Sequence, residues 1–567
     1  MTEPVKETKA QKVERLKREK NPWEHLDEIR EFARRGFEAI PPEWIGTYFR
    51  FWGVYTQGDG AGAIGGVGGE GKAVPYFMVR IRIPNGLLQS HQVRTIADVT
   101  ERYARGVADI TVRQNVQLHW IRIEDLPDLL DQLWRAGLTT MGACGDDTRN
   151  ITGCPVAGVD AEELFDASPL ALELNRFFVG NAEFYNLPRK FKISLTGCSS
   201  WCSYPEINDV GLTGVIRTHR GVQEQGFSLR IGGGLSTDPH LGLKLDTFVG
   251  WNQVVPVVRT VAEIFRDADV LRENREKARL KFLFLKHGWD ADTFLAELNK
   301  RLGFTLDRAA NEFVPPDVYR DHVGIHRQKQ AGYSYVGAAV LRGRLNALQL
   351  RAAADLSDSF GAGEVRTTAM QNLLIVNVRI ESAAQLAGEL DKVGLQTSGS
   401  PFFRGTVACT GTEFCKLAIT ETKGFARWLV EELDERIPGF EQQLRINITG
   451  CPNSCGQHWI ADLGLEGKRI KVDGQLRDAY YFCVGGAVGQ FQSIARPVGY
   501  RCLASEVPDS IERLLNRFRE YRNNGENLRQ FFSRHTPEEL RGFLAGTIVA
   551  PVERDLSTAP TPHGVEG

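Results

Sequence analysis

The feature of this sequence that most limits its fold is an internal repeat that covers most of the chain. The segment GLLQSHQVRTIAD, which begins at Gly86, returns as GRLNALQLRAAAD from Gly343. Further along, KISLTGCSSWCS (192–203) returns as RINITGCPNSCG (445–456). Segments that recur in the same order indicate a duplicated chain, because chance matches would not keep their order. We therefore expect two structurally equivalent halves.

Each half begins with the pattern of strand, helix, strand and helix. In the first half, FMVRIRIP (77–84) is rich in β-branched residues, and ITVRQNVQLHWIRI (110–123) alternates apolar and polar positions. The segments 91–106 and 126–137 instead show helical periodicity. The remainder of each half is rich in strand patterns. This predicts an α+β fold with a pseudo-two-fold axis, and a site between the halves, because pockets favour domain interfaces.

Composition and charge exclude several classes of protein. The formal net charge is −2, so no global basic field exists to hold nucleic acid or an anionic membrane. The N-terminus is charged and lacks the apolar core of a signal peptide, and no apolar run is long enough to span a membrane. We therefore predict a cytoplasmic protein that binds neither nucleic acid nor membranes. Its ten cysteines are then expected to be metal ligands or buried thiols rather than disulfides.

Four cysteines of the second half have the spacing of a metal site. CTGTEFC (409–415) and CPNSC (451–455) supply two pairs of thiols. Two such pairs can hold a tetrahedral zinc ion or a cubane iron–sulfur cluster. Structural zinc sites usually use closer pairs, so the spacing favours a [4Fe–4S] cluster over zinc. The remaining alternative is four buried thiols without a metal.

The second-half motif, C-x5-C followed by TGCPNSCG, resembles the cluster signature of the sirohaem-containing nitrite and sulfite reductases. The resemblance extends from about Phe51 to Ala550 and covers the ferredoxin-dependent, single-chain type. It implies an α+β fold of duplicated ferredoxin-like half-domains plus two sirohaem- and cluster-binding domains. It also implies that four cysteines hold a [4Fe–4S] cluster, the last of them serving in addition as the axial ligand of the sirohaem iron. These cysteines are Cys409, Cys415, Cys451 and Cys455.

The same resemblance assigns roles to residues of the first half. Arg80 in FMVRIRIP and Arg149 in DTRN would face the substrate, and Lys190 and Lys192 in LPRKFK would be the active-site lysines. Four further residues would lie against the sirohaem. They are Arg113, Gln117 and His119 in TVRQNVQLH, and Asn453 in CPNSC.

Elementary chemistry supports a cationic set in such a site. Sirohaem carries many carboxylates and the substrate is an oxyanion, so both require guanidinium forks and ammonium groups. Lysines crowded among other cations have lowered pKa values and are suitable proton donors. Taken singly, each of these residues has a simpler interpretation: Arg and Lys are mostly solvated, and His119 in an alternating strand is more often a packed core residue.

The remaining cysteines of the first half are less readily interpreted. Some family members carry a Tyr–Cys side-chain crosslink beside the sirohaem, and Tyr55 and Cys144 resemble those positions. The spacing of the four first-half cysteines matches no metal-site signature that we recognise. They are Cys144, Cys154, Cys198 and Cys202. A second metal site in the first half therefore stays open as an alternative.

The resemblance implies a six-electron reduction of sulfite to sulfide, with electrons from reduced ferredoxin. Lys192 and the Tyr55–Cys144 pair favour sulfite. The first alternative is reduction of nitrite to ammonia with the same cofactors. An alternative of another class is an electron-transfer protein with the cluster alone, or a metal-stabilised binding protein. No segment is left over for a flavin or nicotinamide module, which agrees with ferredoxin as the donor. We expect a monomer.

The predicted domain order follows the repeat. The glycine-rich stretch 58–71 fits a dinucleotide-binding pattern, but an extended segment follows it instead of a helix, so it is expected to be a loop. The expected divisions are an N-terminal arm with this loop (1–75), a first ferredoxin-like half-domain (76–142), a first sirohaem- and substrate-binding domain (143–330), a second ferredoxin-like half-domain (331–400), a cluster- and sirohaem-binding domain (401–550) and a disordered tail (551–567).

Overall fold

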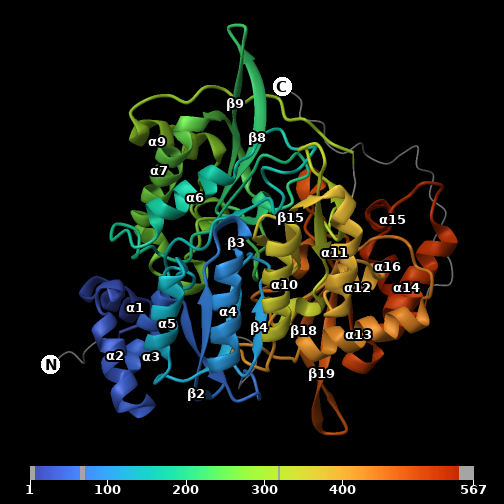
Figure 1. Ribbon diagram of the computed structural model, residues 1–567, viewed down its shortest axis with the longest axis horizontal. Helices are drawn as coiled ribbons and strands as arrows, with labels where there is room; N and C mark the ends of the chain where they lie inside the picture. The colour runs from blue at the N-terminus through green and yellow to red at the C-terminus, as the bar shows by residue number, and fades with distance from the viewer. Residues whose placement is uncertain (1–6, 64–69, 317–318, 548–567) are drawn as a thin grey trace.

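A computed structural model describes residues 7–63, 70–316 and 319–547 of the chain. In these ranges it has sixteen α-helices and twenty strands, and the strands form four sheets of five (Figure 1). The fold is therefore α+β, as the sequence predicts. The predicted disordered tail lies outside the described residues. The predicted domain boundaries themselves stay predictions.

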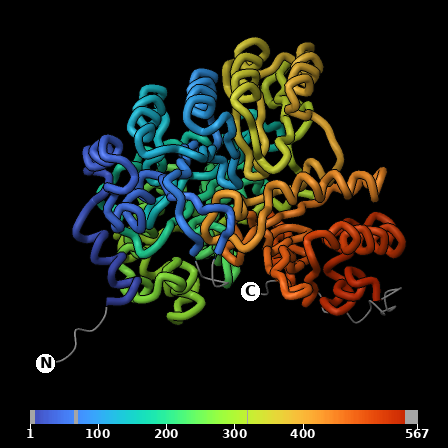
Figure 2. The backbone as a smooth tube through the Cα atoms, turned by 90° about the horizontal axis from the view of Figure 1, so that it is seen from below, coloured from blue at the N-terminus to red at the C-terminus, as the bar shows by residue number. Residues whose placement is uncertain are grey.

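Two of the four sheets have the same construction and belong to the two copies of the repeat. The first is ordered β1 (Val54–Gly58), β2 (Ala73–Ile81), β5 (Val116–Ile121) and β4 (Val107–Ile110), with α4 (Ser90–Tyr103) and α5 (Leu126–Arg135). Its counterpart is ordered β11 (Gly324–Arg327), β12 (Tyr333–Ala338), β15 (Leu373–Arg379) and β14 (Glu364–Thr367), with α10 (Ala347–Phe360) and α11 (Ile380–Lys392). Figure 2 shows the helices of both units in one row on the same face of the molecule.

Each of these sheets is completed by a strand from the other copy. The short strand β13 (Arg344–Asn346) of the second copy pairs with β4, and β3 (Leu87–Gln89) of the first copy pairs with β14. The exchange covers one edge of each sheet, so neither edge is left to pair with another molecule. It also ties the two copies together through backbone hydrogen bonds.

Reciprocal ion pairs between α4 and α10 show the pseudo-two-fold relation most directly. Arg94 of α4 contacts Asp355 at 2.7 Å and Asp358 at 2.6 Å. Arg351 of α10, the repeat counterpart of Arg94, pairs in the same way with Asp98 and Glu101 of α4. The two helices lie side by side at the centre of the molecule (Figure 1).

The other two sheets carry the cysteine motifs. One is ordered β6 (Thr152–Gly153), β7 (Ile193–Thr196), β8 (Val210–His219), β9 (Val222–Ile231) and β10 (Leu243–Gly250). The other is ordered β16 (Thr406–Ala408), β17 (Ile446–Thr449), β18 (Leu463–Val472), β19 (Gln475–Val484) and β20 (Arg496–Leu503). In each sheet the first three strands are parallel and the last two pairings are antiparallel. The long hairpins β8–β9 and β18–β19 project from opposite ends of the molecule (Figure 1).

Helices cover these sheets and form two further apolar cores. The first core includes α6 (Ser168–Phe178), α7 (Val254–Arg266), α8 (Phe282–Lys286) and α9 (Ala291–Leu302). The second includes α13 (Lys423–Arg436), α14 (Val507–Tyr521), α15 (Leu528–Arg534) and α16 (Pro537–Ala545), with α12 (Pro401–Gly405) leading into β16. None of the described helices is long and apolar enough to cross a membrane.

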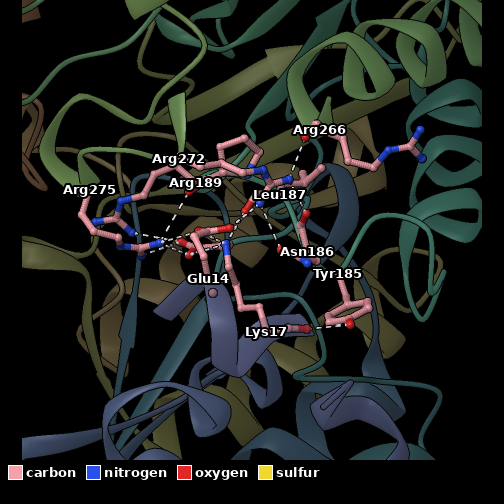
Figure 3. A network of polar contacts seen from close by, with 12 residues as sticks. Glu14, Lys17, Tyr185, Asn186, Leu187, Arg189, Arg266, Arg272 and Arg275 are labelled. Carbon is pink, nitrogen blue, oxygen red and sulfur yellow. Dashed lines mark hydrogen bonds and ion pairs between the residues drawn. The ribbon is translucent and has the colours of Figure 1, made fainter. Parts of the chain in front are cut away.

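The N-terminal arm is bound tightly to the first half. It folds as α1 (Lys9–Glu19), α2 (Leu26–Arg35) and α3 (Pro42–Gly46). Lys17 of α1 has no exposed side-chain surface, and it contacts Glu14 at 2.6 Å and Asp146 at 3.4 Å. Arg275 and Arg189 also reach Asp146, at 2.5 Å and 3.3 Å (Figure 3). This buried ion network fixes the two loops that lead to Arg149 and Lys190, the candidate active-site residues.

Candidate active site

The four cysteines of the second half lie in two loops at one end of their sheet. Cys409 directly follows β16, and Cys451 and Cys455 follow its parallel neighbour β17. The backbone N–H of Gly450 donates to the Cys409 sulfur at 3.2 Å. Burial raises the pKa of the Cys409 and Cys415 thiols, and the charge of Cys455 raises them further. The four thiols are therefore close enough to share one anionic site.

The spacing of these sulfur atoms suits a cluster better than a single ion. Among the described residues, no three of the four have Sγ atoms that all lie within 4.8 Å of one another. Tetrahedral zinc, with Zn–S bonds of about 2.3 Å, holds its sulfurs about 3.8 Å apart. A cubane cluster provides one iron atom for each thiolate and so accepts wider spacing. The side chains present therefore fit a [4Fe–4S] cluster.

The described parts of the glycine-rich loop cover the segment that carries Cys415. The Gly58 N–H donates to the Phe414 carbonyl at 2.9 Å, and the Gly71 N–H donates to the Lys416 carbonyl at 2.8 Å. A Cβ on Gly62 would lie 2.4 Å from the Ala418 carbonyl oxygen. The loop is followed by β2 and not by a helix, as expected. No local feature of the sequence indicates that the loop would lie against the segment with Cys415.

His119 also contacts the Cys409–Cys415 loop. Its ring stacks on Phe414 with centroids 3.8 Å apart, and its Nε2 is 3.4 Å from an Asp109 oxygen. Burial lowers the pKa of His119 despite the neighbouring carboxylate, so the imidazole is neutral. Asp109 is also paired with Arg344 at 2.9 Å. The sirohaem contact suggested for His119 stays a prediction.

Arg80, Gln117, Tyr55 and Cys144 come together beside β2. Arg80 Nη1 donates to the Cys144 sulfur at 2.8 Å. With the Gln117 amide oriented so that its oxygen faces the guanidinium, Arg80 donates to it from Nε at 3.1 Å and from Nη2 at 2.6 Å. Burial raises the pKa of the Tyr55 phenol, and the nearby Cys144 adds to this effect. Residues distant in sequence are thus gathered around one guanidinium.

Two further arginines are held mainly by uncharged oxygen atoms, and one carboxylate oxygen, of Asp147, lies 3.6 Å from Arg149 Nε. Arg149 donates from Nη2 to the Gly145 carbonyl at 2.7 Å. Arg113 donates to the Asn208 side-chain oxygen and to the Asn150 carbonyl, both at 2.7 Å. Burial lowers the pKa of Arg113 to about 9, and the charge of Arg149 contributes. The two guanidinium groups therefore repel each other in a site with too little negative charge.

The two candidate lysines have strongly lowered pKa values. Burial, together with neighbouring guanidinium groups, lowers the pKa of Lys190 to about 7. The charge of Cys455 acts in the opposite direction. Burial lowers the pKa of Lys192 as well, and Arg113 and Lys190 add to it.

One cation of this group was missed by the sequence analysis. Arg279, in the loop before α8, pairs with Asp209 at 2.7 Å. The other Asp209 interaction is with the backbone N–H of Lys192 at 2.8 Å. The sequence around Arg279 is typical of a charged surface segment, and no motif in it predicts a role in the site. Arg279 comes close to Lys192 only in the folded chain.

Together these residues form a buried site with excess positive charge. The repulsion that lowers the pKa values of Arg113, Lys190 and Lys192 would be relieved by a bound polyanion. The carboxylates of a sirohaem and an oxyanion substrate are suitable occupants, because the donors are guanidinium and ammonium groups. The residues present therefore fit the cofactor as well as the substrate class.

Comparisons with known proteins agree with this construction. The nitrite and sulphite reductase 4Fe-4S domain matches residues 144–306 and 399–544, and the nitrite/sulfite reductase ferredoxin-like half domain matches 70–135 and 326–393. The chain is 36% identical to the assimilatory ferredoxin-dependent nitrite reductase of Haloferax mediterranei, over 95% of this chain and 93% of that protein. It is 35% identical to the sulfite reductase [ferredoxin] of Mycobacterium tuberculosis, over 93% of this chain and 95% of that protein.

A solved structure shows the same fold. The structure of the Mycobacterium tuberculosis NirA protein superimposes with a TM-score of 0.86 and 34% sequence identity, over 93% of this chain and 97% of that chain. Fold and site together define a redox metalloenzyme built from two copies of one unit. The chain belongs to the nitrite and sulfite reductase family, whose members bind a sirohaem and a [4Fe–4S] cluster. It is therefore an oxidoreductase, and the alternatives of another class do not fit this membership.

Proposed function

We propose that this protein reduces sulfite to sulfide with six electrons taken from reduced ferredoxin. The observation that carries the proposal is the cluster of cationic side chains around Lys190 and Lys192, because a site with excess positive charge binds a small oxyanion. Relatives whose names include ferredoxin as the donor support that choice of donor. The expected monomeric state and cytoplasmic location stay predictions.

Each group of residues has a separate task in this proposal. Cys409, Cys415, Cys451 and Cys455 would hold the cluster, and Cys455 would also ligate the sirohaem iron. When bound, the two cofactors supply electrons singly to the substrate. Arg113, Gln117, His119 and Asn453 would hold the sirohaem.

The cations of the first half would act on the substrate. Arg80 and Arg149 keep their charge and would bind the oxyanion in a fixed orientation. Lys190 and Lys192 would donate protons to the oxygen atoms that leave as water, because their lowered pKa values make proton release easier. After each donation the neutral lysine would take up a proton from solvent.

The choice of sulfite over nitrite rests on Lys192 and on the Tyr55–Cys144 pair. Relatives at 35–36% identity include both sulfite and nitrite reductases, so identity does not separate the two substrates. Support comes from the lysine at the last position of LPRKFK, where nitrite reductases of the family tend to have asparagine. Nitrite reduction to ammonia by the same residues is the second candidate.

Parallel turnover assays test this choice. The anaerobically purified holoenzyme is supplied with reduced ferredoxin, and sulfide and ammonia are measured with sulfite and nitrite as substrates. We expect the higher kcat/KM for sulfite, and we expect Lys192→Asn to lower the sulfite-to-nitrite ratio of kcat/KM by about tenfold, which is about 1.4 kcal/mol. A preference of the unaltered enzyme for nitrite would contradict the proposed substrate. Lys244→Asn, a half-exposed lysine paired with Glu312 at 3.1 Å, is the matched control.

The Tyr55–Cys144 pair leads to a second prediction. Two observations support a crosslink: Arg80 donates to the Cys144 sulfur at 2.8 Å, and Cys144 contributes to the raised pKa of the buried Tyr55 phenol. We expect peptide mapping of the mature enzyme to show one crosslinked species that contains both residues. Detection of unmodified Tyr55 and unmodified Cys144 peptides in full yield would contradict the crosslink but would leave the assignment of the cluster intact.

A further inference from the structure

The first half contains a cysteine group in the position that the cluster cysteines occupy in the second half. Cys154 directly follows β6, just as Cys409 follows β16. In both sheets the preceding residue pairs with the strand that leads into the TGC motif: Gly153 with Leu195, and Ala408 with Ile448. Cys198 and Cys202 correspond to Cys451 and Cys455 in the repeat. Three of the four cluster positions therefore have cysteine counterparts, and Cys144 is not among them.

The geometry of this group differs from that of the cluster cysteines. The Sγ atoms of Cys154, Cys198 and Cys202 all lie within 4.8 Å of one another. The Cys198 and Cys202 sulfurs are 3.9 Å apart. Zn–S bonds of about 2.3 Å in tetrahedral geometry place two sulfurs about 3.8 Å apart. The spacing is thus that of ligands around one ion, and it is too narrow for one iron atom per thiolate.

The surroundings of Cys198 favour a thiolate over a neutral thiol. Cys154 and Cys198 are 2% and 1% exposed, and Cys202 is half-buried. Arg320 Nη1 lies 3.7 Å from the Cys198 sulfur, and the backbone N–H of Ser200 donates to the same atom at 3.4 Å. A guanidinium and an N–H donor stabilise a sulfur that carries negative charge. Arg320 also pairs with Asp160 at 3.0 Å, and apolar side chains of both halves, among them Leu374 and Val376 of β15, pack around the cysteines.

A cleft adjoins this group on the side of Cys202. Cys202 and Arg320 form part of its wall, together with Tyr319 and Arg445. Arg445 is the repeat counterpart of Lys192, so the cleft is the pseudo-symmetric counterpart of the candidate active site. The counterpart of Arg80 is Gly337, and the counterpart of Gln117 is Leu374. The cleft therefore lacks counterparts of Arg80 and Gln117, although Arg320 and Arg445 line it.

We propose that Cys154, Cys198 and Cys202 bind one zinc ion in tetrahedral geometry. Soft thiolate ligands at this spacing select Zn²⁺ over hard cations. The fourth coordination position is left to a water molecule on the side of the cleft. The ion would join the loops after β6 and β7, as the cluster joins the loops after β16 and β17. The zinc ion has no part in the proposed reduction. The zinc proposal therefore holds whether the substrate is sulfite or nitrite.

Metal analysis of the full-length holoenzyme tests the proposal. The protein is purified anaerobically without chelators, and zinc and iron per chain are measured by plasma mass spectrometry. We expect about one zinc per chain in addition to the iron of the cluster and the sirohaem. X-ray absorption at the zinc edge of the same unaltered protein should show three sulfur neighbours at about 2.3 Å.

Variants assign the ion to these residues. Cys198→Ser should lower the zinc content at least about tenfold and leave the iron content and the sirohaem absorption unchanged. Cys451→Ser should have the opposite effect, with loss of cluster iron and retention of zinc. Cys502→Ser is the matched control, because Cys502 is buried between β20 and α14, away from both groups, and should change neither metal. If Cys198→Ser does not fold, the X-ray absorption at the zinc edge of the unaltered protein still shows whether three sulfur atoms ligate the ion.

Several results would overturn the proposal. One is zinc below about a tenth of an equivalent in the unaltered protein after incubation with Zn²⁺ under reducing conditions. Another is zinc that persists in Cys198→Ser. Additional iron that is lost from Cys198→Ser would indicate a second iron site instead. A Cys198–Cys202 disulfide in protein alkylated at lysis would show that the thiols are not metal ligands.

Discussion

Lys190→Met is expected to lower kcat for sulfite reduction about 100-fold to 10,000-fold, which is the usual contribution of a positioned proton donor. Lys190 lies where burial and neighbouring guanidinium groups lower its pKa to about 7, while the charge of Cys455 acts against them. Methionine keeps the length and apolar body of the side chain, so the effect reports the ammonium group. The cluster and sirohaem absorption should not change, since Lys190 ligates neither.

The pH dependence of kcat/KM tests whether Lys190 acts as a proton donor. Lys190 is charged below its pKa and neutral above it, so kcat/KM should fall as pH rises through that pKa. Bound anions stabilise the charged form, and the falling limb is therefore expected at or above about pH 7. The limb should be absent from Lys190→Met. A profile with the same limb in both proteins would assign it to another group.

Lys190→Arg separates proton donation from anion binding. Arginine keeps the positive charge but does not release a proton at neutral pH. We expect a KM for sulfite close to that of the unaltered enzyme and a kcat nearly as low as that of Lys190→Met. Full recovery of kcat in Lys190→Arg would mean that Lys190 acts through its charge alone.

Asp146→Asn is expected to lower the free energy of unfolding by about 3–5 kcal/mol, because it leaves buried cations without their partner. Asp146 pairs with Arg275 at 2.5 Å, with Arg189 at 3.3 Å and with Lys17 at 3.4 Å. Arg149 and Lys190 follow these contacts closely in the chain, so activity should fall together with stability. The measurement is denaturant unfolding of the holoenzyme, using the first transition, since a chain with several domains need not unfold in one step.

The pH dependence of this effect follows from the direction of the Asp146 shift. Burial alone would raise the pKa of Asp146, but Arg275, Lys17 and Arg189 hold it well below its ordinary value. The stabilisation is therefore present above the unfolded-state pKa of about 3.9 and is lost as pH falls toward the folded-state pKa. The difference between Asp146→Asn and the unaltered protein should be full at neutral pH and shrink below about pH 4.

An exposed ion pair provides the matched control for this variant. Asp355 contacts Arg94 at 2.7 Å, but its side chain is 67% exposed. Exposed pairs contribute at most about 1 kcal/mol because water and salt screen them. Asp355→Asn should therefore leave the unfolding transition nearly unchanged. If Asp146→Asn and Asp355→Asn lower the free energy of unfolding equally, burial of the ion pairs around Asp146 does not add to their stabilising effect.

The repeat and the cysteine spacing could be read from the sequence for a simple physical reason. Periodicity of two and of 3.6 residues is a local property, and a duplicated order of segments is visible without any fold. These features predicted the α+β class and the two equivalent halves, and they led to the prediction, still to be tested, that four cysteines of the second half hold a [4Fe–4S] cluster. The resemblance to a family, carried by the same motifs, supplied the cations Arg80, Arg149, Lys190 and Lys192.

The exchange of β3 and β13 between the halves was not predictable, because strands of three residues have no periodicity to detect. Nor could sequence locate Arg279 beside Lys192 or the glycine loop over Cys415, since both are contacts between distant segments.

The sequence by itself determined the duplication, the strand and helix pattern and the residue types of the site, because these depend on local order along the chain. Only the tertiary structure decided which of the first-half cysteines act together. Sequence spacing grouped Cys144 with Cys154, Cys198 and Cys202, but the fold turns Cys144 toward Arg80 and Tyr55. It gathers the other three because parallel strands end at the same edge of their sheet and bring the loops that follow them together.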